Sequence, residues 1–307
     1  MRKRWRRWKT RKGCNATVIK LSYDKRMKLL EEKWLEDLQK LDIVFQPIVS
    51  IQDGRLYGVE ALLRGVQEIG YASIADFFNR AYCDNVLYTL DLALREKVIQ
   101  KFTTLKDYNR IKLFINLDNR LFEMPNFSAG NTQKLLKRYH LNKEMVCFEL
   151  SEQHAISNIT MFEEVLKHYK SESYSIAVDD FGVGVSGYQM LYRSTPEFIK
   201  IDRFFIDTIF ADTKKKILVQ SIVQLATQLG IVVIAEGIED AKELEVCHTL
   251  GCHLVQGYYI QKPQYDTGAI LEYYDHIPTI KKGSFIKNRL QRPSPFLPCI
   301  ASNILVE

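Results

Sequence analysis

The chain has 307 residues, of which 46% are hydrophobic and 26% are charged. This hydrophobic content is too high for a disordered chain and supports a large core, whereas no apolar run approaches the roughly 18 residues that a membrane-spanning helix needs. The six cysteines form no Cys-x-x-Cys pair, and the basic N-terminus is not followed by the apolar stretch of a secretory signal. We therefore expect a cytoplasmic protein with reduced thiols.

The formal net charge of +6 is unevenly distributed along the chain. The first twelve residues carry eight basic side chains and no acid, whereas residues 13–275 hold 30 basic and 36 acidic side chains. We therefore predict solvated basic tails at 1–23 and 276–307 around a mildly acidic body. Trp5 and Trp8 leave open a contact between the first tail and an anionic surface, either nucleic acid or membrane. The tail is too short for a stable nucleic-acid-binding domain.

The first predicted element is a helix at 24–41, where apolar residues recur at three- and four-residue spacing. After it, short apolar segments alternate with longer helical ones. The predicted strands are 43–50, 56–63, 111–117, 145–150, 174–178, 198–201, 231–235 and 253–256. The predicted helices lie near 73–103, 131–139, 159–169, 187–193, 212–229 and 239–249.

The order of these elements predicts a closed α/β barrel. Residues 52–55 contain an Asp-Gly pair, which favours a hairpin between the first two strands. The later strands alternate with helices, and this alternation predicts parallel pairing. No Pro/Gly/Ser-rich linker interrupts 42–265, so we predict one domain at 42–275 that follows the lead-in helix at 24–41.

Polar residues end most of the predicted strands. Because the carboxyl ends of parallel barrel strands converge on one face, we expect these side chains to meet there. A charge at the end of an apolar strand costs free energy unless it is paired or bound to a metal. The residues are Glu60, Asn116, Glu149, Asp179, Asp180, Lys200 and Glu236.

The chemistry of this set favours a divalent cation. Carboxylate and amide oxygens are the ligands that Mg²⁺ or Mn²⁺ prefers, and no cluster of His or Cys competes for a softer metal. Two ions bridged by a shared carboxylate explain the surplus of negative charge. Each acid taken alone is also compatible with a helix N-cap, as we expect for Asp240. The coincidence of so many at strand ends favours the metal site.

The sequence resembles the EAL domains, the bacterial cyclic di-GMP phosphodiesterases. Glu60-Ala61-Leu62, within VEALLRG, matches the tripeptide that gives the family its name. The resemblance covers about 42–265 in the order and approximate spacing of the family. The other matching motifs are FQPIV (45–49), FINL (114–117), FELSE (148–152), VDDFGVG (178–184), IKID (199–202), IAEGIE (234–239) and QGYYIQKP (256–263).

This resemblance implies a modified TIM (β/α)8 barrel with an antiparallel first strand. It also implies that two Mg²⁺ or Mn²⁺ ions per active site support hydrolysis of cyclic di-GMP to linear pGpG. Lys200 and Glu236 would orient the attacking water. By position, Glu60, Asn116, Glu149 and Asp179 match ligands of a first ion, and Asp179, Asp180 and Glu236 match those of a second.

The resemblance further implies residues that bind substrate and residues that support a loop. Gln46, Arg64 and Gln256, together with Asn116, match positions that contact the dinucleotide. An arginine can bind a phosphate through two parallel hydrogen bonds, which a lysine cannot reproduce. The loop-supporting positions are Glu152 and Asp202. Because that loop also links catalysis to dimerisation in the family, the expected assembly is a homodimer.

The chain departs from the family pattern in the loop after Asp180. Val183 stands where the family carries a threonine, and Val185 replaces an aromatic residue. A separate departure lies outside this loop, where Asp118 follows Asn116-Leu117 in place of a serine. The lost threonine hydroxyl removes one hydrogen bond, worth about 0.5–1.5 kcal/mol. The alternative function is therefore a weakly active or inactive EAL domain that acts as a cyclic di-GMP receptor or protein-interaction module.

Overall fold

The computed structural model describes residues 23–128, 130–151, 159–184 and 187–277. The two basic tails lie outside this range except for their inner ends, so their predicted contacts stay predictions. Glu152 and Val185 also lie outside the described residues.

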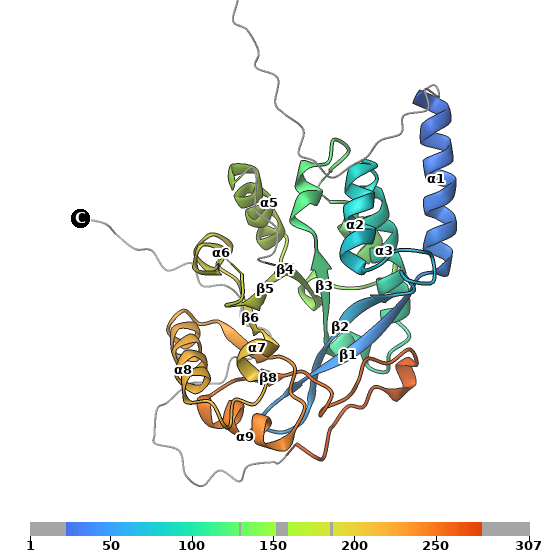
Figure 1. Cartoon of the computed structure of the whole chain (residues 1–307). Helices are drawn as coiled ribbons and strands as arrows, with labels where there is room; N and C mark the ends of the chain where they lie inside the picture. The colour runs from blue at the N-terminus through green and yellow to red at the C-terminus, as the bar shows by residue number, and fades with distance from the viewer. Residues whose placement is uncertain (1–22, 129, 152–158, 185–186, 278–307) are drawn as a thin grey trace, which may run out of the picture.

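Eight strands close into a barrel in the order β1 to β8 (Figure 1). Strand β1 pairs antiparallel with both β2 and β8, and every other neighbouring pair is parallel. This arrangement confirms the predicted fold class. The strands are β1 (Asp42–Ser50), β2 (Leu56–Arg64), β3 (Lys112–Leu117), β4 (Val146–Ser151), β5 (Ser175–Phe181), β6 (Phe198–Ile201), β7 (Val232–Ala235) and β8 (Leu254–Val255).

The hairpin between β1 and β2 turns at Gly54, as the Asp-Gly pair predicts. Gly54 has φ +67°, a conformation that other residues rarely adopt. Its amide donates to the carbonyl of Ser50 at 2.9 Å. A Cβ added at Gly54 would lie 2.6 Å from the carbonyl oxygen of Tyr274, so the close approach of this later segment also requires glycine.

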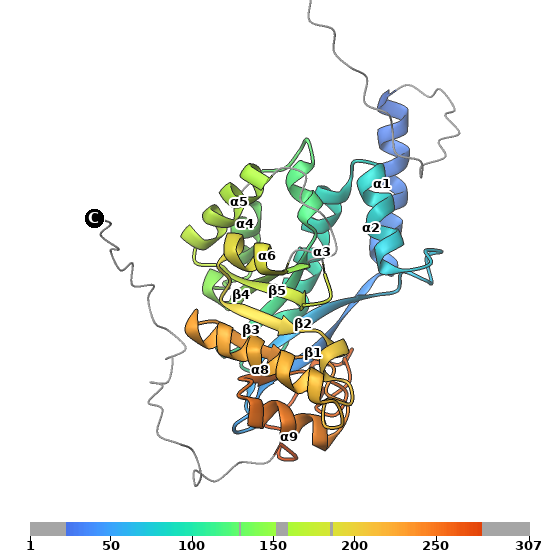
Figure 2. The ribbon, with the colours of Figure 1, turned by 60° about the vertical axis from the view of Figure 1, so that its left-hand side comes forward.

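Helices surround the barrel and connect its parallel strands (Figures 1 and 2). None of the helices in the described part is both long and apolar enough to cross a membrane. The helices are α1 (Tyr23–Lys40), α2 (Ile74–Cys83), α3 (Leu87–Phe102), α4 (Asn131–Arg138), α5 (Ile159–Ser171), α6 (Gly187–Ser194), α7 (Arg203–Ile206), α8 (Thr213–Gln228) and α9 (Ala241–Leu250).

The prediction of one helix near 73–103 was wrong, because the structure has two. Helix α2 ends at Cys83, and α3 begins at Leu87. Between them Asn85 has φ +59°, and asparagine tolerates this left-handed conformation better than most residues. The apolar periodicity continues through the break, since α2 and α3 bury residues against the same core, and this continuity concealed the turn.

Two predicted helix starts are confirmed by their capping hydrogen bonds. The hydroxyl of Ser73 accepts from the amide of Asp76 at 3.1 Å. Asp240 and Glu243 form a capping box at the start of α9, in which the side chain of each residue accepts a hydrogen bond from the backbone amide of the other. The short helix α7 was not predicted, since four residues carry no readable periodicity.

Candidate active site

The predicted site residues form the upper layer of the barrel interior. Alternate residues of a strand face the same side, so seven of these residues lie two positions from an apolar residue that fills the barrel below them, whereas Glu60 on β2 lies two positions after Gly58. On the parallel strands the polar residue follows the apolar one, and on the antiparallel β1 it precedes it. The pairs are Ile48 and Gln46, Phe114 and Asn116, Cys147 and Glu149, Ala177 and Asp179, Phe198 and Lys200, Ile234 and Glu236, and Leu254 and Gln256.

Lys200 lies at the centre of this layer with a side chain that is only 1% exposed. Its Nζ atom forms ion pairs with four carboxylates, one each from β2, β4 and β5 and one that directly follows β7. The distances from Nζ are 3.3 Å to Glu60, 2.8 Å to Glu149, 3.0 Å to Asp179 and 2.7 Å to Glu236. The structure therefore brings together the acids that the sequence placed at separate strand ends.

Burial and charge set the protonation of this cluster. Burial raises the pKa of Glu149, Asp179 and Glu236, and neighbouring carboxylates add to the effect, although the charge of Lys200 opposes it. Burial alone would lower the pKa of Lys200, but the surrounding carboxylates outweigh burial and raise it well above its ordinary value. Lys200 is therefore a permanent cation. The raised pKa values favour the neutral form of these acids, because one ammonium cannot balance four carboxylates, and a divalent cation would supply the charge that allows all of them to ionise.

Glu60 is held by hydrogen bonds that favour its charged form. Gln256 Nε2 donates to Glu60 Oε2 at 2.6 Å, and Asn116 Nδ2 donates to Glu60 Oε1 at 3.1 Å. Burial alone would raise the pKa of Glu60, but Lys200 and these two amides lower it. Gln256 Nε2 also lies 3.2 Å from Gln46 Oε1. Gln46 and Gln256 thus join the layer through Glu60.

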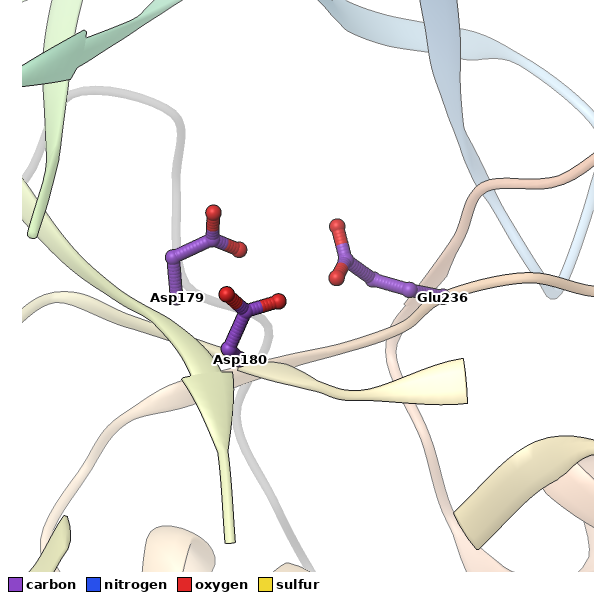
Figure 3. Close-up of side chains that lie close together, drawn as sticks. All are labelled: Asp179, Asp180 and Glu236. Carbon is purple, nitrogen blue, oxygen red and sulfur yellow. The ribbon is translucent and has the colours of Figure 1, made fainter. Parts of the chain in front are cut away.

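Asp180 joins the site through an irregularity in β5. Adjacent residues of a regular strand face opposite sides, but the pairing of β5 with β6 shifts between Val178 and Phe181. Asp180 has φ +53° at this point. The carboxylates of both neighbouring aspartates lie beside that of Glu236, which follows β7, as Figure 3 shows. One oxygen from each of Asp179, Asp180 and Glu236 lies within 4.8 Å of the others.

These three carboxylates fit a divalent cation. Their donor atoms are all hard oxygens, as Mg²⁺ and Mn²⁺ prefer, and the group corresponds to the predicted ligands of the second ion. The predicted first set is also gathered in one layer, but Lys200 and the amides of Asn116 and Gln256 contact its carboxylates. The assignment of that first set stays a prediction.

Two further predicted residues lie at the edge of the site. Arg64 ends β2, and its Nη1 donates to the backbone carbonyl of Leu63 at 2.8 Å. Asp202 caps α7 by accepting from the amide of Phe204 at 2.8 Å. The next residue of that helix, Phe205, lies so close to Gly182 that a Cβ there would be 2.7 Å from the ring. Through this contact Asp202 is connected to the loop that it is predicted to support.

Sequence reasoning missed a second group of buried polar residues beside the site. Asp91 and Arg95 lie on α3, and Asn119 lies in the short helix after β3. The four-residue spacing of Asp91 and Arg95 indicates an ion pair on a helix, but it does not show which way the pair faces. The pair lines a cavity that extends to Asn116 and Asp179.

Comparisons with known proteins agree with this architecture. The family model described as "EAL domain" matches residues 31–263. The cyclic di-GMP phosphodiesterase PA2567 of Pseudomonas aeruginosa is 32% identical over 227 residues, which are 72% of this chain and 38% of that protein. The probable cyclic di-GMP phosphodiesterase PdeI of Escherichia coli is 30% identical over 239 residues, 74% of this chain and 29% of the relative. The chain thus spans less than two fifths of the length of these relatives.

Solved structures give the same result. A standalone EAL protein from Vibrio cholerae O395, bound to cyclic di-GMP, superposes with a TM-score of 0.61 and 28% identity, covering 73% of this chain and 92% of that one. BlrP1 of Klebsiella pneumoniae, in complex with manganese and cyclic di-GMP, gives a TM-score of 0.65 and 29% identity, covering 73% and 56%. The family match, the barrel and the layer of acids agree, and the chain belongs to the EAL-domain family.

Proposed function

We propose that this chain is a phosphodiesterase that hydrolyses cyclic di-GMP to linear pGpG with two Mg²⁺ or Mn²⁺ ions. The observation that carries the proposal is the layer of acids around Lys200 at the carboxyl end of the barrel. The relatives named as cyclic di-GMP phosphodiesterases and the cyclic di-GMP complexes of similar structures support the choice of substrate.

Two overlapping sets of ligands would hold the ions. Asp179, Asp180 and Glu236 would hold one, and Glu60, Asn116 and Glu149, with Asp179 shared, would hold the other. When bound, such ions polarise a phosphoryl oxygen and lower the pKa of a coordinated water. The excess of carboxylates over lysine in the described site supports this assignment.

Lys200 supplies a fixed positive charge rather than a base. Because its pKa is raised, it stays protonated at neutral pH and can only donate hydrogen bonds. Its Nζ contacts the carboxylates of Glu236 and Glu149 at 2.7 and 2.8 Å, so it fixes the orientation of both. A cation at this position also stabilises negative charge that develops on a phosphate in the transition state.

Arg64 and the two glutamines would bind the dinucleotide. Arg64 lies four residues after Glu60 on β2, on the same face of the strand and at the rim of the site. Its guanidinium can bind a phosphate through two hydrogen bonds. Gln46 pairs with Glu60 across β1 and β2, and its Nε2 keeps one N–H besides the one donated to the carbonyl of Gln261. Gln256 Nε2 donates to both Gln46 and Glu60, so Gln256 would meet the substrate through its Oε1, which has no partner among the described residues.

The test is hydrolysis of cyclic di-GMP by the purified chain with Mg²⁺ or Mn²⁺, with pGpG separated by chromatography. We expect turnover by the wild type and a loss of at least about a hundredfold in Glu60→Ala. Glu68→Gln, an exposed carboxylate outside the site, is the matched control and retains activity. If neither metal yields pGpG while cyclic di-GMP still binds, the chain is a receptor rather than an enzyme.

We also propose that a second copy of this chain covers α6. Tyr188 and Tyr192 on α6 are 71% and 84% exposed, and Val183 in the neighbouring loop is 47% exposed. Large apolar groups gathered on one face are typical of a protein interface. Light scattering measures the assembly, and we expect a dimer that Tyr192→Asp converts to a monomer. The control Tyr258→Asp, exposed on another segment, leaves the dimer intact; a monomeric wild type contradicts the proposal.

A further inference from the structure

Glu243, in the first turn of α9, is a buried carboxylate outside the proposed catalytic set. It is only 3% exposed, and no ion pair among the described residues includes it. Burying a charge without a cation costs free energy unless hydrogen bonds replace the lost hydration. The groups around Glu243 must therefore supply these hydrogen bonds.

Backbone amides of two different loops supply them. Glu243 Oε1 accepts from the amide of Thr208 at 2.9 Å. Glu243 Oε2 accepts from the amides of Glu239 and Asp240 at 2.8 and 3.3 Å. The bond from Asp240 belongs to the capping box of α9, whereas the bonds from Thr208 and Glu239 lie outside it. Thus Oε1 serves the loop after α7, and Oε2 serves the loop after β7.

These two loops follow neighbouring strands that carry residues of the proposed active site. Thr208 lies just after α7, the short helix that begins three residues after Lys200 on β6. Glu239 lies three residues after Glu236, which directly follows β7. Strands β6 and β7 pair in parallel, so both loops leave the same end of the barrel. Glu243 therefore joins the chain segments that continue from Lys200 and from Glu236.

Arg203, the first residue of α7, fastens the same two segments from outside. Its Nη1 atom lies 2.5 Å from Glu239 Oε1, and both side chains of this pair are exposed. A Cβ added at Gly237 would lie 2.5, 2.7 and 2.9 Å from Cγ, Cβ and Cδ of Arg203. Because Gly237 has no side chain, α7 can pack directly against the residue that follows Glu236.

We propose that Glu243 is a positioning residue, which holds the carboxylate of Glu236 in place by joining the loop after β7 to the loop after α7. Arg203 supplies a second, weaker link between the same segments, since an exposed ion pair contributes little. The proposal rests on the proposed function, in which Glu236 helps to hold a divalent cation. Both oxygens of Glu243 accept from backbone amides, so Glu243 acts through Glu236 rather than on the substrate.

The position of Glu236 needs such support. Its Oε1 atom lies 2.7 Å from Lys200 Nζ, and its carboxylate faces those of Asp179 and Asp180 (Figure 3). A cation site requires its ligands to be held within about 0.5 Å of the binding geometry. Gly237 has φ +70°, and glycine leaves the chain after Glu236 free to adopt other conformations. The hydrogen bonds to Glu243 restrict that freedom.

The first experiment removes one of the two links. Glu243→Gln keeps the size of the side chain but has a single acceptor oxygen, so it can serve one loop and not both. We expect the Kd for Mn²⁺, measured by calorimetry without substrate, to rise about tenfold or more. At saturating Mn²⁺, kcat for cyclic di-GMP should fall by a similar factor while KM changes less, because no substrate contact is lost. A Kd equal to that of the wild type overturns the proposal.

Asp240→Ala is the matched control for a purely structural role of Glu243. Asp240 Oδ1 accepts from the amides of Lys242 and Glu243 at 2.8 and 2.9 Å. The substitution therefore removes the other half of the capping box and weakens the start of α9, but leaves the carboxylate of Glu243 in place. It should keep the wild-type Kd for Mn²⁺. If both variants raise the Kd equally, Glu243 is only a helix cap, and the proposal is overturned.

The second experiment uses the exposed link. We expect Arg203→Ala to fold, because the side chain of Arg203 is half exposed, and to raise the Kd for Mn²⁺ about threefold. Arg138→Ala is its control, since Arg138 on α4 is also an exposed arginine paired with a glutamate, and it keeps the wild-type Kd. Circular dichroism and melting curves verify the fold of every variant. If Glu243→Gln does not fold, an unchanged Kd in Arg203→Ala overturns the proposal.

Mn²⁺ binding and hydrolysis together separate this proposal from the proposed function. If the wild type binds Mn²⁺ but yields no pGpG, a weaker affinity in Glu243→Gln supports the positioning role while the hydrolytic function fails. If the wild type yields pGpG and Glu243→Gln equals it in Kd and kcat, the hydrolytic function stands and the positioning role is overturned. If the wild type neither binds Mn²⁺ nor yields pGpG, both proposals fail.

Discussion

The two layers of the barrel interior are built from the same strands but have opposite effects on the stability of the fold. In the lower layer Phe114, Phe198 and their neighbours exclude water and pack closely. The upper layer, two residues nearer the carboxyl ends of the parallel strands, gathers carboxylates around Lys200 at the expense of stability. The comparison shows that residues at every second position of the same strands can form both the core and the site. The change from apolar to acidic residues along a strand marks the boundary between the two layers.

The largest effect is expected for Lys200→Met in the upper layer. Without the ammonium, four buried carboxylates lose their counter-charge, and the metal-free protein should lose about 3–5 kcal/mol of unfolding free energy. Hydrolysis should fall by about a hundredfold or more. Denaturant unfolding measures the first effect and the pGpG assay the second. The exposed Lys167→Met is the control, and an equally stable Lys200→Met would show that the cluster does not depend on its lysine.

Neutralising an acid of the upper layer should raise the unfolding free energy of the metal-free protein, whereas truncating a side chain of the lower layer should lower it. Phe198→Ala leaves a cavity beneath the site and should cost about 3–5 kcal/mol. Glu149→Gln removes one buried charge from an over-supplied cluster and should stabilise the metal-free protein by about 1–2 kcal/mol while abolishing hydrolysis. Urea unfolding with EDTA present compares the two. A destabilised Glu149→Gln would mean that the carboxylate contributes to the fold.

Divalent cations should stabilise the protein through the upper layer alone. At a hundred times the dissociation constant, a bound ion raises the unfolding free energy by about 2.7 kcal/mol. Melting curves with Mn²⁺ and with EDTA measure this shift. In Asp180→Asn the shift should be smaller, whereas Phe198→Ala, if folded, keeps it. A shift that survives in Asp180→Asn places the ion elsewhere.

The smallest effect concerns pH and lies outside both layers. His253 Nδ1 accepts from the amide of Val233 at 3.0 Å, and burial lowers the pKa of His253 below its ordinary value. As the pH falls, His253 is therefore protonated in the unfolded chain before it is protonated in the folded protein. The contribution of His253 to the unfolding free energy is complete above its ordinary pKa and is lost as the pH falls from that pKa to the lower pKa of the folded state. The loss should be about 1 kcal/mol, the worth of one hydrogen bond.

The measurement is urea unfolding at pH 7.5 and pH 5. In His253→Asn, whose side-chain oxygen can accept the same hydrogen bond without a charge, the difference between the two pH values should shrink. The exposed His140→Asn serves as the control. A pH dependence that is the same in His253→Asn and in the wild type would assign it to other groups.

The layers also show what the sequence could predict. The barrel follows from the order of strands and helices along the chain, its antiparallel first strand from the Asp-Gly pair in 52–55, and the polar strand ends from the acids that close the apolar runs. The place of Asp180 does not follow, since it depends on a local irregularity that turns two adjacent acids to one side. The central position of Lys200 among four acids depends on closure of the barrel, and the sequence of a single strand does not indicate which residues of other strands it will meet.

The helices were predicted less completely for a related reason. The break between α2 and α3 depends on Asn85 adopting a left-handed conformation, which asparagine permits but does not require. The direction in which Asp91 and Arg95 face depends on how α3 lies against the barrel. Their four-residue spacing fixes only that they are neighbours on the helix.

The antiparallel direction of β1 determines which end of the barrel the chain enters. Because Asp42 lies opposite Arg64 at the end of β2, β1 begins at the rim where the acids are, and it runs away from them. Helix α1 therefore joins the barrel on the catalytic side, where Lys97 Nζ donates to the carbonyls of Leu38 and Leu41. A parallel first strand would have placed this junction at the opposite end. The junction of α1 and the entrance of the site thus lie at the same end of the barrel.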